Sequence, residues 1–389
     1  MKKENSLKNQ KKVNIKFLMI GYFFAILSYI LLNYFLPFYL KEKGLNILEI
    51  GTLLTTGLAL GSLIVGVLFS KLQRKIKLKS GLNISAFFYF VTSFIFVVIP
   101  NYIGVIVSNL LGGIAKVTFK VSTDVTMQHN SSREEHRKIS AINLIVDSLA
   151  VVFGLVISLI LINSIGFLNA LWIFSIFALI ALYFFSKVHD RTRFKSKKEQ
   201  ILPKISMNLK LILASEILYW LGLASSFSLV ITFLVTDYFS GSIGWIAVLF
   251  IVLYASITLT TLFTRKILDK LDLFKSSIFG MILLLFSALI IIFSRNLYFV
   301  GLGMILEGIG AGIWVPSKTA LYWGLTPSGS REIVSGYLSG LRTFASTIGP
   351  LFGGVLVAYL GILAPFYFKM IIALVSIVLY VYLMARQDR

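Results

Sequence analysis

The chain has 389 residues, of which 57% are hydrophobic and 14% charged, whereas roughly a quarter of the residues in a soluble domain are charged. It contains no cysteine, which excludes disulfide bonds, thiolate metal sites and cysteine nucleophiles. Its formal net charge is +21, but the basic residues lie beside apolar stretches. We therefore attribute the charge to membrane topology and anionic lipid headgroups, and expect no nucleic acid partner.

Apolar stretches recur along the whole chain, each long enough to cross the roughly 30 Å hydrocarbon core of a bilayer. Backbone groups in lipid must satisfy their own hydrogen bonds, so these stretches predict helices, and the alternating strands of a barrel do not occur in the sequence. The first stretch lacks a small-residue cleavage site and is predicted to be a retained span. The twelve predicted spans are 17–40, 47–70, 79–99, 102–125, 139–163, 166–187, 208–236, 243–264, 274–294, 297–324, 333–359 and 362–385.

Lysine and arginine alternate between the two sides of these spans. The N-terminus, every second connection and the C-terminus hold 29 of the 37 basic residues, whereas the opposite connections hold Lys41, Lys43 and Arg295. Because short cytoplasmic loops retain basic residues, this bias predicts that both termini are cytoplasmic.

The longest hydrophilic connection, at 188–207, divides the spans into six plus six. We therefore predict an N-terminal six-helix bundle at 1–187, a basic cytoplasmic linker at 188–207 and a C-terminal six-helix bundle at 208–389. The halves also look duplicated, and repeated halves predict a substrate site between them near the bilayer midplane. Adding 195 to a residue number pairs Ser140 with Ser335, Asp147 with Arg342, Gly154 with Gly349, and Gly166 with Gly361.

Local motifs also support an organisation into two six-helix bundles. The segment 37–51 (PFYLKEKGLNILEIG) and the segment 66–75 (GVLFSKLQRK) resemble the first external loop and the signature between helices two and three of the major facilitator superfamily. The resemblance implies an all-α fold of twelve transmembrane helices in two pseudo-symmetric six-helix bundles. The chain departs from the signature at Ser70 and Gln73, where the family usually has aspartate and glycine.

The resemblance also implies a latch on the cytoplasmic side. In the family the missing aspartate contributes to that latch, so the usual latch is in doubt in this chain. The acidic-then-basic pattern that closes the fourth helix is present from Asp124 to Arg137. The gating or structural candidates are Gly66, Arg74, Asp124 and Arg137, with Asp124 favoured as structural.

Eight charged residues lie within the predicted spans and away from their ends, although a charge at the bilayer centre costs on the order of 3 kcal/mol or more. They must therefore face one another or water. Glu307 is placed roughly 16 Å from the outer end of its helix, whereas Lys369 is placed near the outer surface, where it would snorkel. The substrate-binding or coupling candidates are Lys116, Lys120, Asp147, Glu216, Glu307, Lys318 and Arg342.

Each candidate has more than one open interpretation. Lys116 and Lys120, with Lys318 opposite, form a positive cavity for an anionic or zwitterionic solute, or they snorkel along a vestibule while Lys120 pairs with Asp124. Asp147 and Arg342, equivalent in the two halves, form a gating pair, a structural pair, or have separate partners.

Two further carboxylates are candidates for proton coupling. Glu307 and Glu216 exchange protons as the halves rock, or they stay paired with Lys318 or Arg342.

These observations predict a secondary transporter that moves a small charged or polar solute across a prokaryotic plasma membrane by alternating access, with proton coupling as one option. A multidrug efflux antiporter and a non-transporting sensor or assembly partner are the alternatives. The three histidines lack metal-ligand spacing, and no phosphate-binding loop is present, so we expect neither an enzyme nor a cofactor. The expected partners are the solute, protons where coupling applies, and membrane lipids, and we expect a monomer.

The predicted orientation can be tested with a cysteine placed in the 188–207 loop of this naturally cysteine-free chain. A membrane-impermeant maleimide added to intact cells should leave that cysteine unlabelled, because the loop is predicted to face the cytoplasm. The same variant should be labelled after permeabilisation. Labelling from outside intact cells would overturn the topology.

Overall fold

The computed structural model describes residues 2–72, 78–129, 136–188, 206–267, 272–326 and 331–387, and these residues contain helices but no strand. Twelve helical segments are long and apolar enough to cross a membrane, which confirms the predicted number of spans. The elements are α1 (Lys2–Tyr34), α2 (Leu36–Glu42), α3 (Ile47–Leu72), α4 (Leu78–Val98), α5 (Tyr102–His129), α6 (His136–Ile165), α7 (Phe167–Ser186), α8 (Met207–Ser225), α9 (Ser228–Phe233), the π-helix η1 (Leu234–Tyr238), α10 (Ile243–Ile267), α11 (Leu273–Ile292), α12 (Leu297–Leu325), α13 (Arg331–Leu360) and α14 (Ala364–Gln387).

Two of the twelve spans are interrupted. The first runs from Ile15 to Glu42 through α1 and α2, and the seventh runs from Met207 to Tyr238 through α8, α9 and η1. At the second break the hydroxyls of Ser225 and Ser226 both donate to the carbonyl of Gly222, a side-chain bond that competes with regular helix geometry. The break lies beside the pocket described below.

The fold is that of two six-helix bundles, and the repeat predicted from the sequence is visible in it. Adding 195 to the first and last residue numbers of α6 (His136–Ile165) gives those of α13 (Arg331–Leu360). Each of these helices is followed by a glycine with positive φ, Gly166 at 80° and Gly361 at 93°. A left-handed conformation is readily available only to glycine, so the two halves share the same helix–turn–helix corner. Most of the predicted linker at 188–207 lies outside the described residues, and its boundaries stay a prediction.

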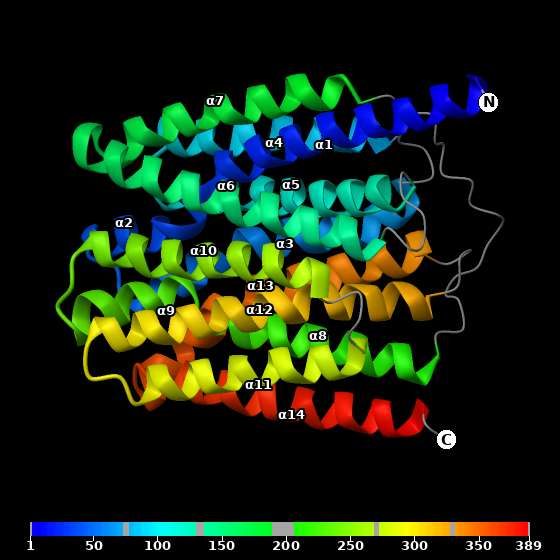
Figure 1. Ribbon diagram of the computed structural model, residues 1–389. Helices are drawn as coiled ribbons and strands as arrows, with labels where there is room; N and C mark the ends of the chain where they lie inside the picture. Colours follow the sequence, from blue (N-terminus) through cyan, green and yellow to red (C-terminus); the bar gives the residue numbers. More distant parts are fainter. Residues whose placement is uncertain are drawn as a thin grey trace.

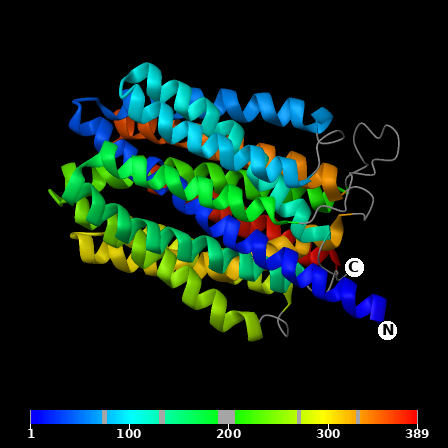
Figure 2. The ribbon, with the colours of Figure 1, turned by 90° about the horizontal axis from the view of Figure 1, so that it is seen from above.

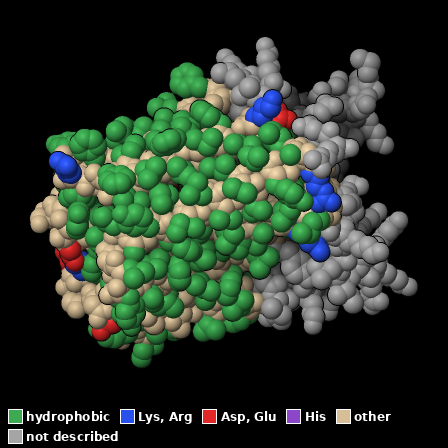
Figure 3. All heavy atoms as spheres, turned by 90° about the horizontal axis from the view of Figure 1, so that it is seen from below, with side chains coloured by type: hydrophobic (Ala, Val, Ile, Leu, Met, Phe, Trp, Pro, Cys, Tyr) green, Lys and Arg blue, Asp and Glu red, His purple; other side chains and the backbone are tan. Residues whose placement is uncertain are grey.

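The bundle has two distinct ends. The chain ends lie at one of them, which we call the termini face (Figures 1 and 2). The opposite end, which we call the far face, carries the α2–α3 connection, η1 and the α11–α12 connection. Between the two ends the surface in Figure 3 is mostly hydrophobic, and Lys, Arg, Asp and Glu gather toward the ends. Large apolar side chains in the middle of the spans are also exposed, such as Phe153 at 55%, as expected for a surface in contact with lipid.

Glycines allow neighbouring helices to pack closely in both halves. In the N-terminal half, a Cβ added at Gly61 of α3 would lie 2.0 Å from the Leu110 carbonyl oxygen of α5. In the C-terminal half, a Cβ at Gly353 of α13 would lie 2.0 Å from the Ser225 carbonyl oxygen of α8. Small residues of this kind permit the close helix approach on which membrane bundles rely.

We expect Gly61→Ala to destabilise the protein by about 1–3 kcal/mol, because the new methyl group forces two backbones apart. The matched control is Gly340→Ala, where the added Cβ meets nothing within 4 Å and helix propensity favours alanine by up to about 1 kcal/mol. Thermal unfolding of the purified protein should show a lower Tm for Gly61→Ala and an unchanged or higher Tm for Gly340→Ala. Equal Tm values for the two variants would contradict the packing account.

Candidate functional site

A central pocket of about 220 Å³ lies between the two halves. The N-terminal half lines it from α1, α3, α5 and α6, and the C-terminal half lines it from α8, α9, α10, α12 and α13. The sequence placed the seven substrate-binding or coupling candidates on the fourth, fifth, seventh, tenth and eleventh spans, which are α5, α6, α8 with α9, α12 and α13. All of these line the pocket. The contributions of α1, α3 and α10 were missed, although Asn33 and Tyr254 are polar groups on apolar spans that could have indicated them.

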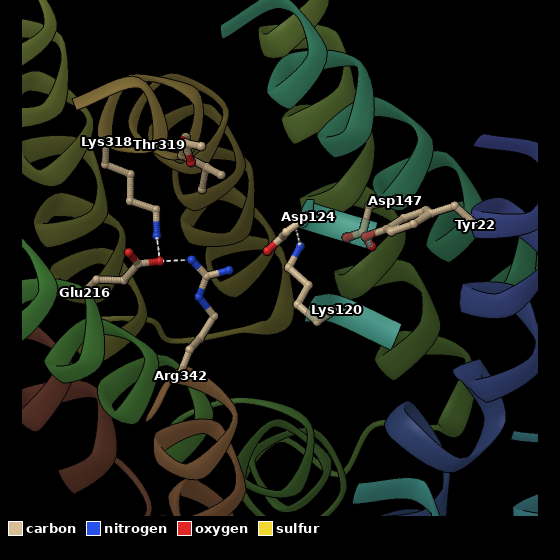
Figure 4. A network of polar contacts seen from close by, with 9 residues as sticks. Tyr22, Lys120, Asp124, Asp147, Glu216, Lys318, Thr319 and Arg342 are labelled. Carbon is tan, nitrogen blue, oxygen red and sulfur yellow. Dashed lines mark hydrogen bonds and ion pairs between the residues drawn. The ribbon is translucent and has the colours of Figure 1, made fainter. Parts of the chain in front are cut away.

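Lys116 and Asp147 both line the pocket, from α5 and α6. Asp147 accepts a hydrogen bond of 3.0 Å from the hydroxyl of Tyr22 on α1 (Figure 4). Within the described part of the chain, neither Lys116 nor Asp147 forms an ion pair, and Lys116 donates no hydrogen bond. These two groups are thus charged side chains that the pocket wall leaves open to a solute.

Asp147 and Arg342 do not pair in the structure, so of the three interpretations left open for them, separate partners is the one observed. Arg342 instead pairs with Glu216, while Tyr22 satisfies Asp147. The two residues occupy equivalent positions in the repeat, but each finds a partner on a helix of its own half. Equivalence under the pseudo-symmetry therefore does not bring them into contact.

Glu216, Lys318 and Arg342 form one buried cluster between α8, α12 and α13, and we call it the cationic cluster. Lys318 Nζ and Arg342 Nη2 both donate to the same oxygen, Oε1 of Glu216 (Figure 4). Lys318 is 1% exposed and Glu216 is fully buried, so the interpretation in which Lys318 snorkels along a vestibule does not hold in this structure. The sequence allows two interpretations of Glu216, as a proton-exchanging carboxylate or as the partner of Lys318 or Arg342. In the structure it is paired with both cations.

Aromatic rings complete the cationic cluster. Lys318 Nζ lies 4.0 Å from the ring centroid of Trp314 and 5.8 Å from that of Trp220. The Arg342 guanidinium carbon lies 5.5 Å from the Trp220 centroid. Ring faces attract cations, and the attraction is strongest away from water. The two tryptophans therefore stabilise positive charge at a depth where it is otherwise costly.

Glu307 has a partner that the sequence analysis did not assign. Lys369 of α14 donates to its Oε1 at 2.6 Å, and Ser287 of α11 lies 3.5 Å from Oε2. The Lys369 side chain is 5% exposed, so the prediction that it snorkels to the outer surface is wrong. Its backbone starts about 8 Å into α14, and a buried carboxylate within reach draws the ammonium inward rather than outward. Glu307 also lines the pocket.

Lys120 pairs with Asp124 one turn along α5, with Nζ and Oδ1 3.5 Å apart. This is the structural interpretation of Asp124, in which Lys120 has a carboxylate partner on its own helix. Gly66 lies within α3, whereas Arg74 and the side chain of Arg137 fall outside the described residues. A latch at the termini face involving these residues stays a prediction.

The two halves are joined across the far end of the pocket. Lys41 of α2 forms an ion pair with Asp237 of η1 and donates to Thr236 Oγ1 at 2.5 Å, and we call these three residues the far-face latch. Deeper in, the hydroxyls of Tyr34 and Tyr254 are hydrogen-bonded at 2.6 Å. The sequence showed Lys41 as one of three basic residues on the far side and Asp237 as an acid near a span end, but gave no sign of their pairing.

Comparison with known proteins agrees with this architecture. Multidrug resistance protein 2 of Bacillus subtilis (strain 168) is 26% identical over 175 residues, which are 45% of this chain and 43% of that protein. The match therefore spans less than half of that relative.

Solved structures resemble the whole chain at low sequence identity. The human organic anion transporter MFSD10 (TETRAN) has a TM-score of 0.78 at 17% identity, covering 95% of this chain and 99% of that one. FucP, a Major Facilitator Superfamily transporter in the outward conformation, has a TM-score of 0.73 at 12% identity, covering 96% and 99%. A bacterial homologue of the iron transporter ferroportin, in an outward-facing state, has a TM-score of 0.71 at 13% identity, also covering 96% and 99%. At these identities the likeness shows the fold.

The sequence pattern of the Major Facilitator Superfamily matches residues 18–241 and 212–389, which together reach from the first span to the C-terminus. Twelve membrane-crossing helices, a repeated half and a pocket between the halves accompany that match. The chain therefore belongs to the Major Facilitator Superfamily, and it is a secondary transporter rather than an enzyme.

Proposed function

We propose that this protein moves a small solute with a charged or polar group across a prokaryotic plasma membrane by alternating access, with the termini face in the cytoplasm. The observation that carries the proposal is the pocket between the halves, into which Lys116 and Asp147 point without an ion-pair partner among the described residues. Burying unpaired charge is costly in a membrane interior, and such groups are typical of transport pathways.

The rest of the pocket wall limits the kind of solute. Leucines, Trp220, Phe227 and Tyr254 make most of the wall apolar or aromatic. A solute that fits has a compact apolar body and one or two polar groups, so that apolar burial supplies affinity and the polar groups supply orientation. A strongly polar solute without an apolar body fits this wall poorly.

Multidrug efflux is the second candidate function. Two observations support multidrug efflux: the pocket wall is apolar and aromatic, and part of the chain is similar to a protein named for multidrug resistance. The two functions differ in the number of unrelated solutes that the protein accepts. A panel of amino acids, organic acids, sugars and cationic dyes, offered to reconstituted protein under an imposed pH gradient, distinguishes them.

We assign proton coupling to Asp147. Glu216 is held by two cations and Glu307 by one, whereas Asp147 has a tyrosine hydroxyl as its partner and lines the pocket. A carboxyl that forms no ion pair can take up a proton without breaking a buried salt bridge. Binding of solute beside Lys116 then alters the electrostatic environment of Asp147, which links solute binding to protonation.

Alternating access requires the far face to open. The far-face latch and the Tyr34–Tyr254 hydrogen bond join the halves there, so these contacts must break as the pocket becomes accessible from outside. Because the latch is partly exposed, with Lys41 at 25% and Asp237 at 51%, its rupture costs little free energy. A weak contact of this kind biases the equilibrium between two conformations without blocking it.

Asp147→Asn should abolish solute accumulation driven by a pH gradient in proteoliposomes, because an amide at this position cannot exchange a proton. Solute exchange across the membrane at equal pH should persist at a comparable rate, since the pocket keeps its shape. The matched control is Glu42→Gln, an exposed carboxylate at the end of α2. Gradient-driven accumulation that survives in Asp147→Asn would refute the assignment.

Lys41→Gln should shift the protein toward a conformation open at the far face. With Ser228→Cys in the pocket as reporter, labelling by an impermeant maleimide from the far side should become about 1.4- to 5-fold faster, as expected for an exposed ion pair worth 0.2–1 kcal/mol.

Lys43→Gln provides the control for this measurement, because the Lys43 ammonium lies over Tyr39 of its own half and forms no ion pair with the described residues of the other half. The double exchange of Lys41→Asp with Asp237→Lys should return labelling toward the original rate. An unchanged rate in Lys41→Gln would show that the latch does not bias the equilibrium.

A further inference from the structure

We propose that the cationic cluster binds the anionic group of the ligand, which makes the solute class a small amphipathic organic anion. This inference rests on the proposed function and names the chemistry of the solute.

The charges of the cluster do not balance. Glu216 carries one negative charge, while Lys318 and Arg342 each carry a positive charge and share its Oε1 atom. Lys120 and Asp124, which Figure 4 draws beside the cluster, form a pair of zero net charge. One positive charge is therefore left without a partner inside the membrane region, where such a charge costs on the order of 3 kcal/mol. An anion bound beside the cluster would balance it.

Arg342 is the member of the cluster that can receive this anion. A guanidinium has five N–H donors, and the hydrogen bond of Arg342 to Glu216 uses Nη2, while its buried Nε has no acceptor within the described residues. Its side chain is 15% exposed, whereas Lys318 and Glu216 are closed off. Figure 4 shows the guanidinium extending from α13 toward the side of Lys120 and Asp124. The planar donor set matches carboxylate, sulfonate and phosphate oxygens.

The cluster lies one helical turn beyond the pocket, toward the termini face. Trp220, Val315 and Ser346 line the pocket on α8, α12 and α13. Glu216, Lys318 and Arg342 lie three or four residues away on the same three helices, each on the side of the termini face, which is about 4.5–6 Å along the helix axis. The Trp220 ring lies near both cations and also borders the pocket. An anionic group on Arg342 thus places an attached apolar body against the leucines and Trp220.

The other embedded basic residues leave no comparable excess of positive charge. Lys369 is matched by Glu307 at 2.6 Å, and Lys116 shares its pocket with the opposite charge of Asp147. A cationic solute would meet Asp147 but also the net positive charge of the cluster. The charge distribution therefore favours an anion at the termini end of the pocket.

The test uses three ligands with one naphthalene body and different head groups: 2-naphthoate, 2-naphthylmethanol and 2-naphthylmethylammonium. Binding is measured by isothermal titration calorimetry on the full-length protein in lipid nanodiscs, with empty nanodiscs subtracted. Arg342→Gln is the informative variant, because it leaves Glu216 and Lys318 as a balanced pair and so preserves the fold. Arg295→Gln is the matched control, since it removes the same charge from an exposed position at the far face.

Wild type and Arg295→Gln should bind 2-naphthoate more tightly than the other two ligands. Arg342→Gln should bind 2-naphthoate at least about tenfold more weakly, as expected for the loss of a charged hydrogen bond, with the affinity for 2-naphthylmethanol unchanged. The inference is overturned by an unchanged affinity in Arg342→Gln, by equal or tighter binding of 2-naphthylmethylammonium, or by no binding of 2-naphthoate up to its solubility limit. Transport of any solute by wild type would then leave the proposed function standing, whereas Arg342-dependent binding without any transport would contradict the function alone.

Discussion

The cost of holding charge inside a membrane governs the arrangement of this molecule. Two carboxylates that lie deep in the C-terminal half are neutralised by cations of the same half, Glu216 by Lys318 and Arg342, and Glu307 by Lys369. These pairs tie α8, α12 and α13 together on one side and α12 and α14 on the other. Because breaking a buried pair leaves an uncompensated charge, we expect the C-terminal half to keep these contacts while the two halves move against each other.

In the N-terminal half, two charged side chains in the pocket form no ion pair among the described residues. Asp147 has a tyrosine hydroxyl as partner, and Lys116 has neither an ion pair nor a hydrogen bond among the described residues. Both face the pocket. The asymmetry gives the halves distinct tasks in the proposed mechanism: Asp147 and Lys116 respond to protons and solute, while the cationic cluster supplies a fixed positive charge. Contacts between the halves at the far face, such as Lys41 with Asp237, are weaker and exposed, as a reversible closure requires.

The sequence predicted much of this fold, because its signals are local. Twelve apolar spans follow from length and hydropathy, and the repeat follows from matched positions such as Gly166 and Gly361, both of which adopt positive φ. The pairing of charges could not be predicted, because it depends on the rotation of each helix about its axis and on the reach of long side chains. Lys369 starts near the far end of α14 yet extends inward to Glu307. Asp147 and Arg342 are equivalent in the repeat yet have separate partners. The far-face latch joins residues about 200 positions apart in the sequence, and its members stand next to span ends where charges are common.

The central claim is that the pocket between the halves is the path of the solute, and chemical blockage of that pocket tests it most directly. Leu58 lines the pocket, and Leu60, two residues along the same helix, is 48% exposed on the lipid side. With no native cysteine to interfere, Leu58→Cys and Leu60→Cys can each be modified with a bulky maleimide in proteoliposomes before uptake of the solute panel is measured. The account predicts that modification abolishes uptake in Leu58→Cys and leaves it intact in Leu60→Cys. Undiminished uptake by the modified Leu58→Cys protein would contradict it.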